Sequence, residues 1–70
     1  MKRITFGEKV IASAGYDAQR AWLELEFTQT GKTILFISVP EDVWYGLQNT
    51  DFPDKYFRRH IRNKFEEYGN

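Results

Sequence analysis

The stretch WLELEF at residues 22–27 decides the fold. Its apolar residues alternate with other residues, so that Leu23, Leu25 and Phe27 share one face. Successive side chains of a β-strand point to opposite faces of the sheet, and this alternation therefore predicts a strand with one buried face. The opposite face carries Trp22, Glu24 and Glu26.

Two further strands are predicted on either side of this one. Residues 10–16 are small and apolar, and the turn-forming residues 17–20 follow them, which is typical of an earlier strand. Residues 33–39 are rich in β-branched and aromatic side chains, which favour a later strand. Because only the polar, glycine-containing residues 28–32 join this strand to the one at 22–27, the two must run antiparallel.

A first helix is predicted to begin at Pro40. Proline suits the first turn of a helix, where its missing N–H needs no partner. Glu41 and Asp42 come next, and acidic side chains favour the positive end of a helix dipole. The apolar side of this short helix is predicted to consist of Val43, Trp44 and Leu47.

A second helix is predicted over residues 55–67. Phe52-Pro53 cannot lie inside a helix, and Asp54 suits the N-cap position of the helix that follows. Apolar residues recur at every fourth position of the segment, which predicts one buried side made of Phe57, Ile61 and Phe65.

These elements together predict an α+β fold, a three-stranded antiparallel meander followed by two helices packed on one face. Seventy residues leave room for one core, so a single domain is expected over residues 1–70. Within it, residues 1–9 are expected to form an extended lead-in whose Ile4 and Phe6 touch the core, and residues 10–67 the folded core. The predicted core consists of Leu23, Leu25, Phe27, Val43, Leu47, Phe57, Ile61 and Phe65.

The composition excludes several classes of protein. The chain has no cysteine, which excludes disulfide scaffolds, thiolate nucleophiles and cysteine zinc sites. Its longest apolar run, within residues 34–39, is far shorter than the ~20 residues that span a bilayer. The basic start at residues 1–3 is not followed by the apolar core of a signal peptide. We therefore expect a cytoplasmic protein that does not enter a membrane.

Two candidate chemical motifs fail on their spacing. Gly31-Lys32-Thr33 ends like a phosphate-binding loop, but the required earlier glycine is replaced by Glu26, and a strand follows where the motif needs a helix. Ser13 and His60 could be combined with an aspartate, but no nucleophile elbow is present and so small a domain has little volume for a cleft of ~300 Å³ or more. His60 is the sole histidine, so no zinc site is predicted. We expect no catalysis, no cofactor, no metal and no small-molecule substrate.

The most informative stretch is KYFRRHIRNK at residues 55–64. It holds half of the ten lysines and arginines of the chain and no acid, although the chain as a whole is neutral. At about 100° per residue, the basic side chains spread over one side of the predicted helix, next to its apolar side. Guanidinium groups bind phosphate oxygens, and aromatic rings stack on unpaired bases. We therefore predict a site for RNA or another polyanion, made of Lys55, Tyr56, Arg58, Arg59, His60 and Arg62.

Two alternatives to this site remain open. In the first, the basic residues form a solvated helix face, and the acids Asp54, Glu66, Glu67, Glu24 and Glu26 balance their charge. In the second, the partner is a folded protein, and the chain is a module such as a phage-type accessory or inhibitor protein. An exposed tryptophan between acids suits a protein interface, so a second candidate surface consists of Trp22, Glu24 and Glu26, unless the N-terminal segment or a helix covers Trp22.

From about residue 10 to residue 65 the chain resembles the KTSC domain. This short module is named for its occurrence at the C-terminus of some lysyl-tRNA synthetases, and it also exists as stand-alone small bacterial and phage proteins. The features that carry the resemblance are, in order, Gly15-Tyr16-Asp17, the alternating strand 22–27, Gly31 in the hairpin, Val39-Pro40, and Lys55-Tyr56-Phe57 through His60-Ile61-Arg62.

The chain departs from the family pattern at two places. The central Tyr-x-Tyr pair of the family corresponds to Ile34 and Phe36 here, so the phenolic hydroxyls are missing. The family's Ser-x-Gly before the second helix is replaced by Phe52-Pro53-Asp54. The family has no established activity, and RNA binding has been suggested from the proteins that the domain accompanies. The resemblance therefore implies a small binding module, and the basic residues of the second helix are retained.

Overall fold

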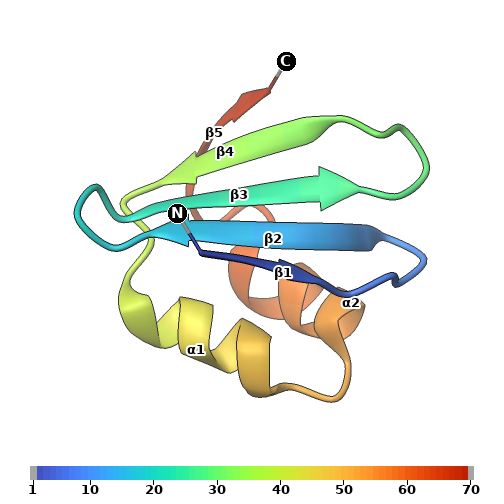
Figure 1. Cartoon of the computed structure of the whole chain (residues 1–70). Helices are drawn as coiled ribbons and strands as arrows, with labels where there is room; N and C mark the ends of the chain where they lie inside the picture. Colours follow the sequence, from blue (N-terminus) through green and yellow to red (C-terminus); the bar gives the residue numbers. More distant parts are fainter. Residues whose placement is uncertain (1, 70) are drawn as a thin grey trace.

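The alternating stretch at residues 22–27 forms the middle strand of an antiparallel sheet in the computed structural model, which describes residues 2–69 (Figure 1). Every strand pairs with its neighbour in the chain, in the order β1-β2-β3-β4-β5. The strands are β1 (Lys2–Thr5), β2 (Ile11–Asp17), β3 (Trp22–Phe27), β4 (Thr33–Ile37) and β5 (Glu66–Gly69). The helical elements are α1 (Glu41–Asn49), α2 (Pro53–Tyr56) and the π-helical turn η1 (Phe57–Ile61).

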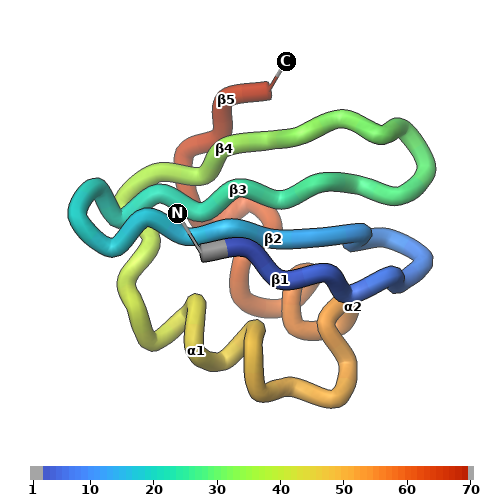
Figure 2. The backbone as a smooth tube through the Cα atoms, viewed as in Figure 1, coloured from blue at the N-terminus to red at the C-terminus, as the bar shows by residue number. Residues whose placement is uncertain are grey.

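The prediction of three strands was wrong, although the α+β class is correct. The two further strands are β1 and β5, each only four residues long, and they form the two edges of the sheet (Figure 2). β1 places Ile4 opposite Ala14 of β2, and β5 places Gly69 opposite Ile34 of β4. Neither segment has a clear alternating pattern of its own. Each forms a strand by pairing its backbone with the edge of the neighbouring strand.

The core lies between the inner face of the sheet and the helical elements. The register sets Leu23 of β3 opposite Tyr16 on one side and Phe36 on the other, so that these side chains share the inner face. Figure 1 shows α1 and α2 on this same face. The buried hydrophobic residues are Ile11, Ala14, Tyr16, Leu23, Leu25, Phe36, Val39, Trp44, Leu47, Phe57 and Ile61. The predicted core residues Phe27, Val43 and Phe65 are partly buried against them, as are Ile4 and Phe6.

The second helix starts earlier and ends earlier than predicted. Pro53 is its first residue, and the Arg62 N–H donates to the Phe57 carbonyl at 2.8 Å, five residues back, which closes a π-type turn. Asn63 then adopts the left-handed conformation with φ 60°, and the chain reverses toward the sheet. Asparagine tolerates this conformation better than most residues, so it is a common helix stop.

Asp54 has a different role from the predicted N-cap. Its carboxylate accepts the backbone N–H groups of Val10 at 3.1 Å and Ile11 at 3.0 Å. The side chain therefore fastens α2 to the start of β2 and the residue before it. Neither α1 nor α2, the helices of residues 2–69, has the length and apolar character of a membrane-spanning segment.

Candidate nucleic-acid interface

The predicted basic residues lie on the solvent side of α2, η1 and the turn that follows. Tyr56 is half-buried, and the other predicted site residues are exposed. Phe57 and Ile61 of the same segment turn inward and are 7% and 0% exposed. The inward packing of these two residues therefore directs their basic neighbours to solvent.

Four of the five acids that could have balanced these cations have other partners, and the fifth, Glu67, lines a depression together with Arg62. Glu24 pairs with Arg3, and Asp54 accepts backbone N–H groups. The two ion pairs found within residues 2–69 are Arg3–Glu24 and Arg20–Asp17, and neither includes a cation of the second helix. These cations are therefore available for an external anion.

Four of the predicted site residues surround one small hollow together with Phe52. The hollow, called the aromatic hollow below, has a volume of about 160 Å³. Its lining consists of Thr50, Phe52, Lys55, Tyr56, Arg59 and His60. Phe52 is 67% exposed, an unusual exposure for so large an apolar ring. Sequence reasoning missed Phe52 as a site residue, although its place directly before the basic helix could have indicated it.

Tyr56 is held in the hollow by close packing on α1. A side chain at Gly46 would place its Cβ 2.1 Å from the Tyr56 hydroxyl oxygen, so only glycine permits this approach. The ring centres of Tyr56 and His60 lie 4.5 Å apart, and the ring planes are inclined by 40°. Burial raises the pKa of Tyr56, and the negative charge of Asp42 adds to this effect. The hydroxyl therefore stays protonated at neutral pH.

A second and larger depression lies between the sheet and the end of η1. This apolar groove has a volume of about 480 Å³, above what the small size of the chain led us to expect. It is lined by Val10, Phe27, Gln29, Thr30, Lys32, Ile34, Phe36, Phe57, Arg62, Asn63 and Glu67. Arg62 is thus separated from the other predicted site residues. Arg58, in the described part of the chain, lines neither depression.

The groove contains the two positions at which this chain departs from the Tyr-x-Tyr pattern. Ile34 and Phe36 both point to the inner face of β4 and line the groove. Sequence reasoning missed the groove because its residues come from β3, β4, β5, η1, the hairpin loop 28–32, the loop before β2 and the turn after η1. No local pattern relates these segments.

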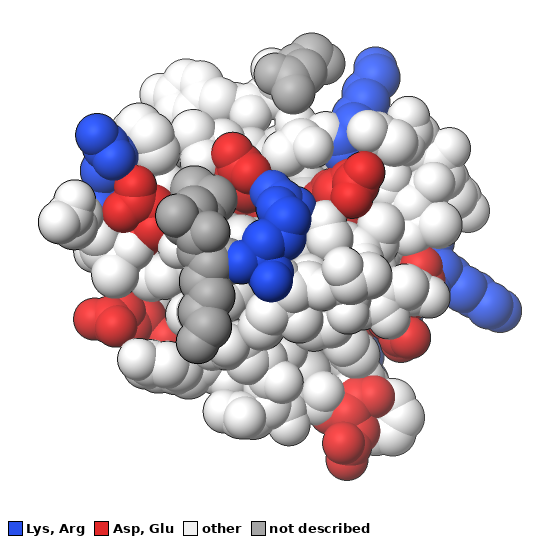
Figure 3. Space-filling view, viewed as in Figure 1, with Lys and Arg blue, Asp and Glu red and all other residues white. Residues whose placement is uncertain are grey.

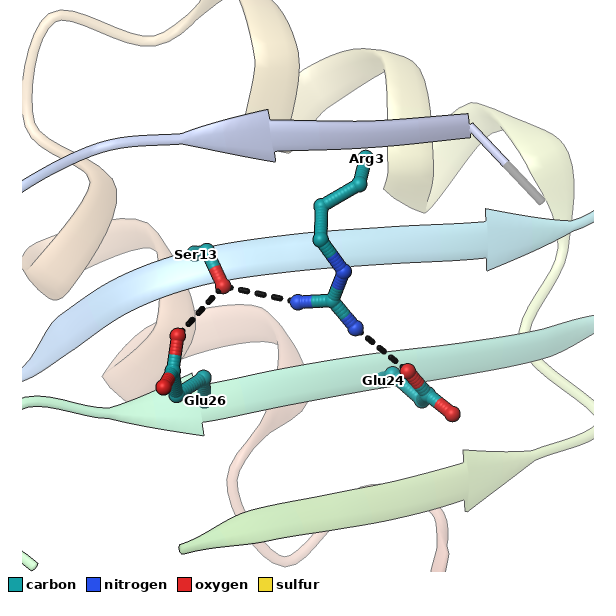
Figure 4. A network of polar contacts seen from close by, with 4 residues as sticks. All are labelled: Arg3, Ser13, Glu24 and Glu26. Carbon is teal, nitrogen blue, oxygen red and sulfur yellow. Dashed lines mark hydrogen bonds and ion pairs between the residues drawn. The ribbon is translucent and has the colours of Figure 1, made fainter. Parts of the chain in front are cut away.

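The second predicted surface lies on the open face of the sheet, away from the helices (Figure 4). Arg3 donates to the Ser13 hydroxyl at 2.7 Å and to Glu24, and Ser13 donates to Glu26 at 2.8 Å. Figure 3 shows basic and acidic side chains side by side at the middle of this face. The two acids of the predicted surface are therefore joined in one polar network.

Trp22 of this surface is half-buried, and it lies on the face of β3 opposite to the buried Leu23. The Arg20 guanidinium lies 5.2 Å from the centre of its ring, in cation–π contact. Ser13 is buried on this open face, whereas His60 is exposed on η1 at the opposite face. These two residues do not meet as a catalytic pair.

Comparison with known proteins agrees on one family. A sequence model of the KTSC domain matches residues 8–65 of the chain. The crystal structure of a KTSC domain protein from Yersinia pestis is similar to this fold with a TM-score of 0.91 and 26% sequence identity, and the similarity covers 99% of this chain and 96% of that one. No curated protein sequence matches the chain. With most of its length matched by the family model, the chain belongs to the KTSC domain family.

Proposed function

We propose that this protein is a small binding module that holds single-stranded RNA at the aromatic hollow. The observation that carries the proposal is the pairing of an exposed aromatic residue with unengaged cations. Phe52, Lys55 and Arg59 line one hollow, and no ion pair of residues 2–69 includes either cation.

The hollow offers the two interactions that single-stranded nucleic acids need. Lys55 and Arg59 supply positive charge for backbone phosphates, and Arg58, the residue before Arg59, adds a third exposed cation outside the hollow. The exposed ring of Phe52 supplies a surface on which a base stacks. Every base has a flat π-face, so such binding is tolerant of sequence.

Binding is tested with a fluorescein-labelled octauridylate and fluorescence anisotropy at several salt concentrations. Because three phosphate contacts release counterions, the logarithm of the affinity should fall with the logarithm of the salt concentration with a slope of about −2. Phe52→Ala should weaken binding about five-fold or more, since it removes one base–aromatic stack. Arg59→Glu should weaken it further.

The matched control is Arg20→Glu, which makes the same change of charge. Arg20 is already paired with Asp17 at 2.9 Å, so its cation is not free for a phosphate. Retention that ignores salt, or an equal loss with Arg20→Glu and Arg59→Glu, would contradict a site at the hollow.

A protein partner is the second candidate, and one observation favours it. The open face of the sheet carries the half-buried Leu35 and, opposite it on β5, Tyr68, which is 55% exposed. Affinity capture from nuclease-treated lysate separates the two functions. A partner protein that survives nuclease treatment and is lost on Leu35→Glu would assign the function to the open face.

A further inference from the structure

The apolar groove combines an apolar floor with a charged rim, and it shares no residue with the aromatic hollow. We propose that it is a second subsite for the same RNA strand and takes one unpaired nucleotide. The base lies on the floor, and the phosphate lies at Lys32 and Arg62. This inference rests on the proposed function at the aromatic hollow.

The floor offers a surface that is fixed before a ligand arrives. Phe36 and Phe57 are 1% and 7% exposed and form its buried back, while Phe27 and Ile34 are only half-buried and reach the groove. The rings of Phe27 and Phe57 meet edge to face at 5.5 Å. Because this contact holds Phe27 in place, a base that packs on it immobilises little side-chain freedom.

The rim favours an anion. Lys32 and Arg62 are both exposed, and neither takes part in the ion pairs found within residues 2–69. Glu67 is the single acid of the rim, so the two cations leave an excess of positive charge. A guanidinium and an ammonium at the mouth of an apolar groove suit a phosphate attached to a flat apolar group.

The polar side chains of the rim distinguish a base from a hydrocarbon. Gln29 and Asn63 each present an amide with donors and an acceptor, and Thr30 adds a hydroxyl. The Watson–Crick edge of an unpaired base carries matching donors and acceptors. A lipid chain has none, and it would remove these groups from water without partners, at a cost in affinity.

The size and position of the groove suit one nucleotide of an RNA strand that is bound at the aromatic hollow. Its volume of about 480 Å³ lies in the usual range for small-ligand sites, roughly 300–1,000 Å³. Arg62 at the groove follows His60 at the hollow by two residues, so their Cα atoms lie at most about 7 Å apart. A strand of a few nucleotides therefore reaches both sites, and the second site raises the affinity without a separate association step.

The inference is tested by amide NMR shifts of the ¹⁵N-labelled protein. Uridine 5′-monophosphate should shift the amides of Thr30, Lys32 and Asn63, and octauridylate should shift these together with Lys55 and Arg59. Ile34→Glu should abolish the mononucleotide shifts and weaken octauridylate binding five-fold or more. Leu35→Glu is the matched control, because it adds the same charge at the next residue of β4 but on the opposite face, and it should leave both unchanged.

The outcomes separate this inference from the proposed function. Octauridylate that shifts only the amides around the hollow overturns the groove subsite and leaves the hollow as the site. Absence of any octauridylate binding overturns both. A groove that takes acetyl-leucyl-phenylalanine and no mononucleotide is a protein-docking site, which also overturns the inference. If Ile34→Glu unfolds the protein, the mononucleotide shifts of the unaltered protein and their loss in Arg62→Gln decide the question.

Discussion

At the scale of single residues, Tyr16 joins the sheet to the segment that enters α1. Its hydroxyl donates to the Val39 carbonyl at 2.6 Å, and its ring stacks on Trp44 with the ring centres 5.5 Å apart. Burial raises the pKa of Tyr16 above the ordinary value of 10.0, and the negative charges of Glu41 and Asp42 raise it further. The neutral phenol is therefore the form that the fold requires.

We expect Tyr16→Phe to lower the free energy of unfolding by about 1–3 kcal/mol, because the Val39 carbonyl loses its buried donor. The pH dependence has a definite sign. The pKa of Tyr16 is higher in the folded protein than in the unfolded one. The neutral hydroxyl therefore makes its full contribution to the free energy of unfolding below pH 10, and this contribution is lost as the pH rises through the folded pKa. Urea denaturation from pH 8 to pH 11 should show a steeper alkaline loss in the unaltered protein than in Tyr16→Phe. Parallel curves would contradict this role.

At the scale of elements, local patterns predicted those parts whose structure depends on local chemistry. The alternation at residues 22–27 and the Pro40 start both lie where the pattern placed them, as β3 and α1. The end of the second helix was wrong because the apolar spacing continues to Phe65, past the helix stop at Asn63. Residues 66–69 are exposed and form β5 by pairing with the edge of β4, which no property of the segment itself reveals.

The side chain of Asp54 connects two elements that lie far apart in the sequence, α2 and the start of β2. It accepts the N–H groups of Val10 and of Ile11, the first residue of β2, so Asp54→Ala leaves both partly buried donors without their acceptor. We expect a loss of about 1–3 kcal/mol in the free energy of unfolding. Asp51→Ala, an exposed aspartate of the same connection, should change it by no more than about 0.5 kcal/mol. Equal effects of the two substitutions in chemical denaturation would show that the hydrogen bonds accepted by Asp54 do not stabilise the fold.

At the scale of the whole molecule, the core depends on a few large side chains. Ile61 is 0% exposed, and a domain this small retains only ~3–5 kcal/mol of stability. Ile61→Ala should cost ~2–5 kcal/mol, enough to unfold much of the population. Circular dichroism melting checks this, with Phe52→Ala as the control, because Phe52 is 67% exposed and should leave the midpoint nearly unchanged. A normal melt for Ile61→Ala would mean that Ile61 is not a core residue.

The two depressions differ in how far the sequence could predict them. Four of the six residues of the aromatic hollow belong to one helical segment, so the composition of residues 55–64 was enough to indicate them. The apolar groove draws Val10, Ile34 and Glu67 from distant parts of the chain. Such a site exists only after the sheet has closed, and the register of five strands cannot be deduced from the pattern of any one of them.

The position of β5 in the chain has a consequence for the order of assembly. Short turns join each of the first four strands to the next, whereas both helices lie between β4 and β5 in the chain. Closing that long loop costs more chain entropy than closing the short turns, so we expect the C-terminal strand to dock after them. Because Glu67 of β5 forms one wall of the groove, each detachment of this strand opens that wall. We therefore expect entry to the groove to be sensitive to the fraying of this four-residue strand.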